Sequence, residues 1–131
     1  MILDTPLKII NELSLAILLN KTSVMKRFGQ LIRVKPGQFE LYKEYHAAVW
    51  PKVLDTIKKC NIQNYSIYHF DGMLYAYFEY TGVDFREDMK KMAADPKTQE
   101  WWAIMKPIQD PVSNRKPGEW WADMEEVFHL D

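Results

Sequence analysis

The sequence predicts an α+β domain with the order strand, helix, strand, strand, helix, strand, the split arrangement of ferredoxin-like folds. Two observations lead to this prediction. Strand-like segments alternate with segments whose apolar residues recur at helical spacing, and an Asp-Gly pair separates two strand-like segments near the middle of the chain. The length of 131 residues, of which 47% are apolar and 27% charged, fits one soluble globular domain with a single core.

The first elements are a strand and an interrupted helix. Residues 27–34 (RFGQLIRV) have the composition of a strand, and the Lys-Pro-Gly sequence that follows predicts a turn. Because Pro51 lacks an N–H and clashes with the preceding turn, we expect the next helix to kink or break near residues 49–50. The residues that share one stripe of this helix are Phe39, Tyr42, His46, Val49, Val53 and Ile57.

A β-hairpin is predicted around Asp71-Gly72, the dipeptide that two-residue turns with two positive φ angles prefer. If Phe70 pairs with Met73, alternation places the side chains of the two strands on opposite faces. One face carries Ser66, Tyr68, Phe70, Met73, Tyr75 and Tyr77; the other carries Tyr65, Ile67, His69, Leu74, Ala76 and Phe78. Both faces are rich in large apolar groups, so we expect both to be covered.

The second half of the chain predicts helices, a loop and a closing strand. Residues 84–94 (DFREDMKKMAA) have helical spacing, and a further helical stretch begins with Asp95 as the N-cap and Pro96 in the first position. Residues 107–121 contain three prolines, a glycine and two tryptophans, and predict a long, partly ordered loop. We expect residues 125–130 (EEVFHL) to form the last strand.

This architecture predicts a homodimer. In such a fold the helices cover one face of the sheet and leave the other open, and a large open aromatic face associates. Two sheets packed face to face give a symmetric dimer, the commonest oligomer. The assignment of the two faces could be reversed, but a second cover would still be needed. The face expected to be open carries Tyr68, Phe70, Met73, Tyr75 and Tyr77.

Charge and terminal sequence exclude several partners. The net charge is -1 without a dense Lys/Arg cluster, so nucleic acid is not expected as a partner. A single cysteine, Cys60, rules out an internal disulfide and fits a reducing cytoplasm. Residues 1–24 lack the pattern of a secretory signal, and their apolar run at 15–19 is too short to span a membrane. We expect an N-terminal extension at 1–24, either an accessory helix or an annotation artefact, and the folded domain at 25–131.

The residues that could carry chemistry are aromatic rings and one imidazole. The three histidines do not have the spacing of a metal site, and no nucleotide-binding or nucleophile motif occurs, so neither a metal nor a cofactor is expected. If the helix stripe faces the Tyr65 side of the sheet, five residues can surround one cleft: Tyr42, His46, Tyr65, Trp101 and Trp102. Each of them also fits a plain packing role in the core.

A resemblance to a known family favours the functional interpretation. The element YKEYHAAVWP, followed by NYSIY, WW and a terminal EVFHLD, closely resembles the L-rhamnose mutarotase family over residues 25–131. The resemblance implies a dimeric α+β barrel that interconverts the α and β anomers of L-rhamnose in the cytoplasm, with no cofactor. It also implies His46 as the proton donor, and Tyr42, Tyr65, Trp101 and Trp102 as sugar-binding residues.

Two other classes of function fit the same fold. A small monooxygenase acting on a quinone-like or haem substrate would use His46 as a base or axial ligand. A sugar-binding domain without turnover would use the same aromatic residues for stacking only. The sequence also differs from compact members of the family, because KPGEWWADM lengthens the loop before the last strand.

Overall fold

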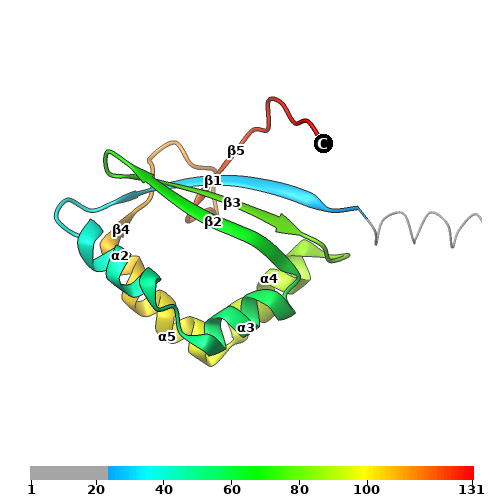
Figure 1. The fold of residues 1–131 in the computed structure, drawn as a ribbon, viewed down its shortest axis with the longest axis horizontal. Coiled ribbons are helices and arrows are strands. Elements are labelled where there is room, and N and C mark those ends of the chain that lie inside the picture. Colours follow the sequence, from blue (N-terminus) through cyan, green and yellow to red (C-terminus); the bar gives the residue numbers. More distant parts are fainter. Residues whose placement is uncertain (1–23) are drawn as a thin grey trace, which may run out of the picture.

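The protein is an α+β half-barrel in which a curled antiparallel sheet lies over a layer of helices (Figure 1). The computed structural model describes residues 24–131. The expectations for the N-terminal extension therefore fall almost wholly outside the described residues. The predicted α+β class is confirmed, with both layers formed within one continuous unit.

The helices and strands alternate as two similar halves. Their bounds are β1 Lys26–Val34, α2 Phe39–Ala47, α3 Pro51–Lys59, β2 Ile62–Phe70, β3 Met73–Tyr80, α4 Phe85–Ala94, α5 Pro96–Met105, the 3-10 helix η1 Lys106–Ile108, β4 Gln109–Asp110 and β5 Ala122–Met124. The strand order is β2-β3-β1-β4, and β5 also pairs with β1. Within residues 24–131 every strand pair is antiparallel. In the same part of the chain, each helix is too short to traverse a bilayer.

The predicted helix break is confirmed. Helix α2 ends at Ala47 and α3 begins at Pro51, which occupies the first turn of the new helix. Trp50 has an extended backbone, with φ -58 and ψ 131, as expected for a residue before proline. The break turns the chain, so that α2 and α3 form two differently directed walls below the sheet (Figure 1).

The central hairpin has the predicted register. Asp71 and Gly72 both have positive φ angles, 50 and 77, and Phe70 pairs with Met73. The opposite pairs Tyr68–Tyr75 and Ser66–Tyr77 also form as predicted. The local turn chemistry therefore places the aromatic residues of the hairpin on the expected faces.

A β-bulge that the sequence did not predict brings Ile62 to the same face of the sheet as Tyr65. The register of β2 and β3 shifts between Gln63 and Ser66, and Asn64 in the bulge has a φ of 48, which asparagine tolerates better than most residues. An extra residue in one strand changes the alternation of side chains. As a result, both Ile62 and Tyr65 reach the helix side of the sheet, although they are an odd number of positions apart.

The predicted closing strand is wrong. We expected residues 125–130, whereas the last strand is Ala122–Met124 and the following residues pair with no strand within residues 24–131. Beyond Met124 the chain leaves β1, to which it stays connected through the Arg27–Glu126 ion pair of 2.8 Å. Val127 and Phe128 are 91% and 80% exposed. Residues 125–130 therefore have no partner strand in the part of the chain that the structure describes.

The core lies between the helices and one face of the sheet, and the outer face is open. Tyr68 and Phe70 on the outer face are 67% and 75% exposed, so the helices cover the Tyr65 side. The first buried cluster comprises Ile32, Val34, Tyr42, Val53, Leu74, Trp101, Met105 and Ile108; the second comprises Cys60, Ile62, Phe78, Tyr80 and Met92. The space between the sheet and the helices is not completely filled by these clusters.

Candidate active site

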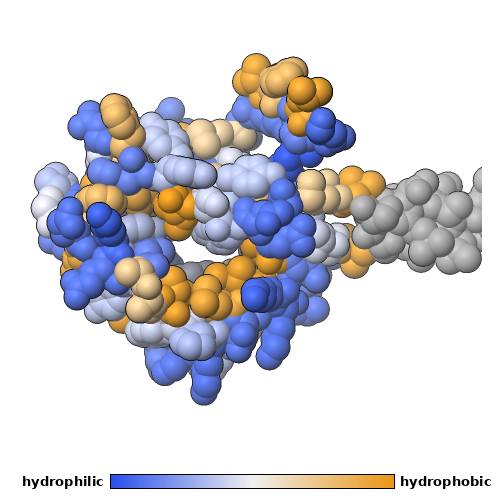
Figure 2. Space-filling model, viewed as in Figure 1, coloured by the Kyte–Doolittle hydropathy of each residue, from blue (hydrophilic) through white to orange (hydrophobic). Residues whose placement is uncertain are grey.

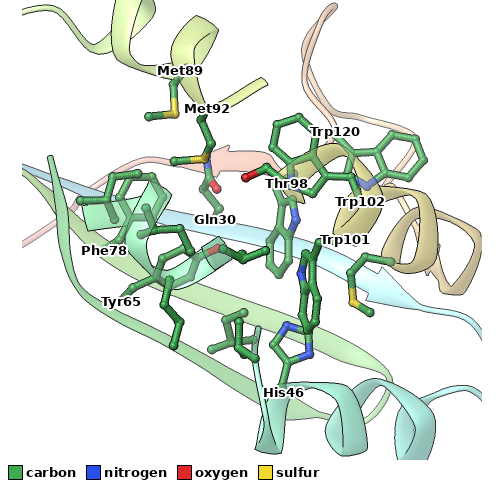
Figure 3. A pocket seen from close by; sticks show the side chains of 18 of the residues that line it. Gln30, His46, Tyr65, Phe78, Met89, Met92, Thr98, Trp101, Trp102 and Trp120 are labelled. Atoms are coloured by element: carbon green, nitrogen blue, oxygen red, sulfur yellow. The ribbon is translucent and has the colours of Figure 1, made fainter. Parts of the chain in front are cut away.

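A cavity of about 860 Å³ lies between the inner face of the sheet and the helices. Figure 2 shows this hollow opening between the two layers, with apolar residues along its wall. Its walls come from both halves of the chain (Figure 3). All five residues selected from the sequence line it: Tyr42, His46, Tyr65, Trp101 and Trp102.

His46 is held in one orientation by its own helix. Its Nδ1–H donates to the carbonyl oxygen of Tyr42 (2.8 Å), and since a carbonyl only accepts, the neutral ring carries its lone pair on Nε2. The ring stacks on Tyr42, with centroids 4.0 Å apart, and meets the edge of Trp101 at 5.4 Å. Burial lowers the pKa of His46, and the bond to the Tyr42 carbonyl offsets part of this effect. Figure 3 shows the ring directed from α2 toward Trp101.

Two tyrosines supply hydroxyl groups to the cavity. Tyr42 is buried, and burial raises its pKa well above the usual range, while the Gln109 side chain partly opposes the rise. Tyr65 is 41% exposed, but its accessible surface faces the cavity, where the surrounding walls raise its pKa to about 12. Both hydroxyls therefore stay protonated at neutral pH and can donate or accept hydrogen bonds.

Trp101 and Trp102 both reach the cavity although they are neighbours on α5. Trp101 is 6% exposed and meets Tyr45 and Trp50 edge to face, with centroids 5.9 and 5.2 Å apart. Trp102 is only partly buried and lies beneath the ammonium group of Lys106, 5.6 Å from its ring centroid. Trp101 therefore belongs to the core beside His46, and Trp102 is nearer the rim.

Several polar residues of the cavity were missed by the sequence analysis. On the sheet, Gln30 donates to Asp123 (2.7 Å), and both side chains line the cavity. A second pair also lines the cavity: the indole N–H of Trp120 donates to the side-chain oxygen of Gln109 (2.8 Å), and Gln109 is buried beside Tyr42. One signal was present, because Gln30 is a polar residue between Phe28 and Ile32 in the inner row of β1. The partners of Gln30 and Gln109 come from the loop and strand at the end of the chain.

The lengthened loop forms part of the cavity rim. Gly118, Glu119, Trp120 and Trp121 line the cavity. The ammonium group of Lys106 lies 5.5 Å from the Trp120 ring centroid, at nearly the same distance as from Trp102. A cation between two indole faces is attracted to both. The loop is thereby connected to the end of α5.

The sequence matches known proteins along nearly the whole described domain. The family described as L-rhamnose mutarotase matches residues 27–130. The L-rhamnose mutarotase of Oceanobacillus iheyensis is 35% identical over 107 residues, which cover 82% of this chain and 100% of that protein. The L-rhamnose mutarotase of Bacillus subtilis is 33% identical over 109 residues, with the same coverage of 82% and 100%.

Two solved structures share the fold. The L-rhamnose mutarotase of Formosa agariphila superposes with a TM-score of 0.64 at 24% identity, covering 81% of this chain and 99% of that one. Tetracenomycin F2 cyclase of Streptomyces glaucescens, a polyketide cyclase, superposes with a TM-score of 0.59 at 14% identity and the same coverage. At these identities the likeness concerns the fold alone.

Proposed function

The chain belongs to the L-rhamnose mutarotase family, and from this premise we propose that it interconverts the α and β anomers of L-rhamnose. The observation that supports the proposal best is the position of His46, whose ring lies in the wall of an aromatic cavity together with the four other selected residues. The reaction consists of proton transfers and rotation about a carbon–carbon bond, so we expect it to proceed without a cofactor.

We propose that His46 is the general acid. Opening a pyranose ring requires a proton on the ring oxygen and the loss of a proton from the anomeric hydroxyl. The imidazolium form can donate from Nε2, because Nδ1–H is held by the Tyr42 carbonyl. The aldehyde then rotates about the bond between C1 and C2. The hydroxyl oxygen formed on opening attacks the opposite face of C1, becomes the ring oxygen again and returns its proton to His46. Such positioned proton transfer contributes about 10² to 10⁴ in rate.

The cavity has the size and lining that a deoxy sugar requires. L-rhamnose has eleven non-hydrogen atoms, and at the roughly 30 Å³ that a water molecule occupies they fill at most about 330 Å³. The cavity of about 860 Å³ therefore holds one sugar together with water. We propose that Trp101 and Trp102 cover the methyl group and C–H bonds, while the hydroxyls of Tyr42 and Tyr65 bind those of the sugar.

Anomeric exchange measured by saturation-transfer NMR tests this function. The protein should accelerate exchange of L-rhamnose above the spontaneous rate, and a panel with L-fucose, D-mannose and L-lyxose should show which hexose or pentose it prefers. An unchanged rate for all four sugars would refute the mutarotase proposal. Sugar binding without acceleration would instead indicate a non-catalytic sugar-binding domain.

The acid role of His46 predicts a pH dependence. Because burial lowers its pKa below the ordinary value of 6.5, the donating imidazolium form is lost as the pH rises through that lowered value. We expect kcat/KM for exchange to be highest below this pKa and to fall about tenfold per pH unit above it. An NMR titration of the His46 ring should give the same midpoint. A limb of the opposite sign whose midpoint coincides with the NMR titration of His46, with activity lost as that ring is protonated, would make His46 a base instead.

We also propose that the protein is a homodimer formed through the outer face of the sheet. Tyr68, Phe70 and Tyr75 are exposed there, and the C-terminal tail, which leaves the sheet on the side away from the helices, exposes Val127 and Phe128. Figure 2 shows the apolar residues of the tail projecting from the body of the molecule. Apolar surface of this kind usually marks an interface between proteins.

Replacing Phe70 with aspartate should therefore convert the dimer to a monomer. Each copy would bury an uncompensated charge in the proposed interface. Sedimentation velocity should show the mass change from two chains to one, and Leu41→Asp, at an exposed site of helix α2 outside the cavity, is the matched control. A wild-type protein that sediments as a monomer would contradict the proposed dimer.

Finally, we propose that residues 25–131 are the catalytic unit and that the protein acts in the cytoplasm. The family match over residues 27–130 supports the first statement. The free thiol of Cys60, buried in the second cluster, is compatible with a reducing compartment and supports the second.

A further inference from the structure

The mutarotase reaction needs a group that takes the proton from the anomeric hydroxyl, and we infer that this group is Asp123, positioned by Gln30. The inference rests on the proposed function and adds the proton acceptor to it. Three observations support it: both side chains lie on the inner face of the sheet, they are hydrogen-bonded to each other, and the other carboxylate of the cavity, Glu119, is bonded to the loop.

The sheet register places Asp123 on the inner face. Gln30 and Asp123 are directly opposite in the antiparallel pair β1–β5, so their side chains point to the same side. That side is the inner one, because Ile32, two residues along β1 from Gln30, is completely buried beneath the helices. Both Gln30 and Asp123 line the cavity accordingly.

The row that contains Asp123 forms the floor of the cavity. Gln30 pairs with Ala76 of β3, which pairs with Ile67 of β2, so these residues and Asp123 form one line across four strands. Of this row, Gln30, Ile67 and Asp123 line the cavity, while Ala76 is buried. Tyr65, a proposed sugar-binding residue, lies on the same face two positions before Ile67.

The other carboxylate of the cavity is already used by the loop. Among the described cavity residues, the carboxylates are Glu119 and Asp123. The two oxygens of Glu119 accept the backbone N–H groups of Lys116 (2.8 Å) and Asp123 (3.3 Å), and these bonds, together with the adjacent Asp123 side chain, lower its pKa. Glu119 therefore stabilises the loop between Lys116 and Asp123, and its lowered pKa makes it a weak proton acceptor.

Asp123 has the bonding expected of an oriented base. Its Oδ1 accepts from the neutral amide of Gln30 (2.7 Å), which fixes the carboxylate without neutralising its charge. Within residues 24–131, no N–H or O–H group donates to Oδ2. The hydroxyls of Tyr42 and Tyr65 hold their protons too tightly to compete as bases at neutral pH, because their pKa values are raised.

Asp123 and His46 together account for every proton that moves during ring opening and closure. The anomeric O–H proton passes to Asp123, the bond between C1 and the ring oxygen breaks, and C1 and its oxygen form the aldehyde. The ring oxygen takes the proton of the His46 imidazolium. On closure, the ring oxygen attacks the opposite face of C1 and returns its proton to His46, while the new anomeric oxygen takes the proton from Asp123. The enzyme is then restored, and only the configuration at C1 has changed.

The experiment compares isosteric variants in the rhamnose exchange assay, with kcat and KM measured separately. D123N should lower kcat at least about 100-fold with KM little changed, because the amide cannot accept the proton. Q30M should lower kcat about tenfold, because the carboxylate loses its orienting hydrogen bond. E125Q removes a neighbouring exposed carboxylate outside the cavity and should retain wild-type values.

A second readout separates a base from a structural group. In D123A, added formate should restore exchange, because a small carboxylate can occupy the vacated place and accept the proton. In Q30M formate should have no effect. Wild-type protein that does not accelerate exchange would refute the mutarotase function itself. Active wild-type protein with full activity in D123N, a larger loss in E119Q than in D123N, or no rescue of D123A by formate would each overturn the assignment of Asp123 alone.

Discussion

Replacing His46 with alanine should reduce the catalysed anomeric exchange of L-rhamnose by about 10² to 10⁴-fold. The imidazole is the group in the cavity wall whose ordinary pKa allows both protonation states near neutral pH. Its Nδ1–H is bonded to the Tyr42 carbonyl, so Nε2, the nitrogen proposed to donate, has a fixed direction. Saturation-transfer NMR of the rhamnose anomers, with kcat and KM determined separately, gives the loss directly.

The matched control is His69→Ala. His69 is exposed, stacks on Phe39 at 3.5 Å and accepts the backbone N–H of Gly72 (3.1 Å), so it serves the hairpin rather than the cavity. Its replacement should leave exchange near the wild-type rate. If His46→Ala retains full activity while its fold is intact by circular dichroism, His46 has only a packing role.

Features of the fold that depend on neighbouring residues were predictable from the sequence. Pro51 ends one helix and starts the next, because its missing N–H and its ring act on the preceding turn. Asp71-Gly72 sets the hairpin register through its positive φ angles. The end of the chain was predicted incorrectly because strand pairing joins distant residues, and no local signal in residues 125–130 tells whether a partner strand is available.

The same distinction applies to the candidate site. His46 and Tyr42 were found because helical spacing places them one turn apart, and Tyr65 because the hairpin register gives its face. The pairs Gln30–Asp123 and Gln109–Trp120 join residues 93 and 11 positions apart. Neither pair has a spacing that a sequence pattern could detect. Gln30, a polar residue between Phe28 and Ile32, was the available signal for the first pair.

The fold by itself carries little information about the reaction. Tetracenomycin F2 cyclase has nearly the same TM-score against this chain as the Formosa agariphila mutarotase, although it is a polyketide cyclase. Unrelated functions often share one fold, and the residues of the site distinguish them. The family match and the arrangement of His46 with the aromatic residues therefore support the function, and the superposition supports the architecture.

Trp101→Ala should have the largest effect on stability, lowering the free energy of unfolding by about 3 to 5 kcal/mol. The indole is almost completely buried and meets Tyr45, His46 and Trp50 edge to face, so its removal leaves a large cavity beside the His46 ring. Since small domains are stable by only about 5 to 15 kcal/mol, the variant should be marginally folded. Urea unfolding at a fixed protein concentration measures the change, because association would otherwise contribute.

Trp120→Ala is the comparison that separates core packing from the cavity rim. Trp120 is partly exposed and is held by its bond to Gln109 and by Lys106, so its loss should cost about 1 to 2 kcal/mol. Trp101→Phe should recover part of the lost stability and activity together, because a smaller ring still supports the His46 imidazole. Equal losses in the free energy of unfolding in Trp101→Ala and Trp120→Ala would contradict the assignment of Trp101 to the core and Trp120 to the cavity rim. In that case the wall behind His46 would not depend on Trp101, and the orientation of the imidazole would come from the Tyr42 carbonyl alone.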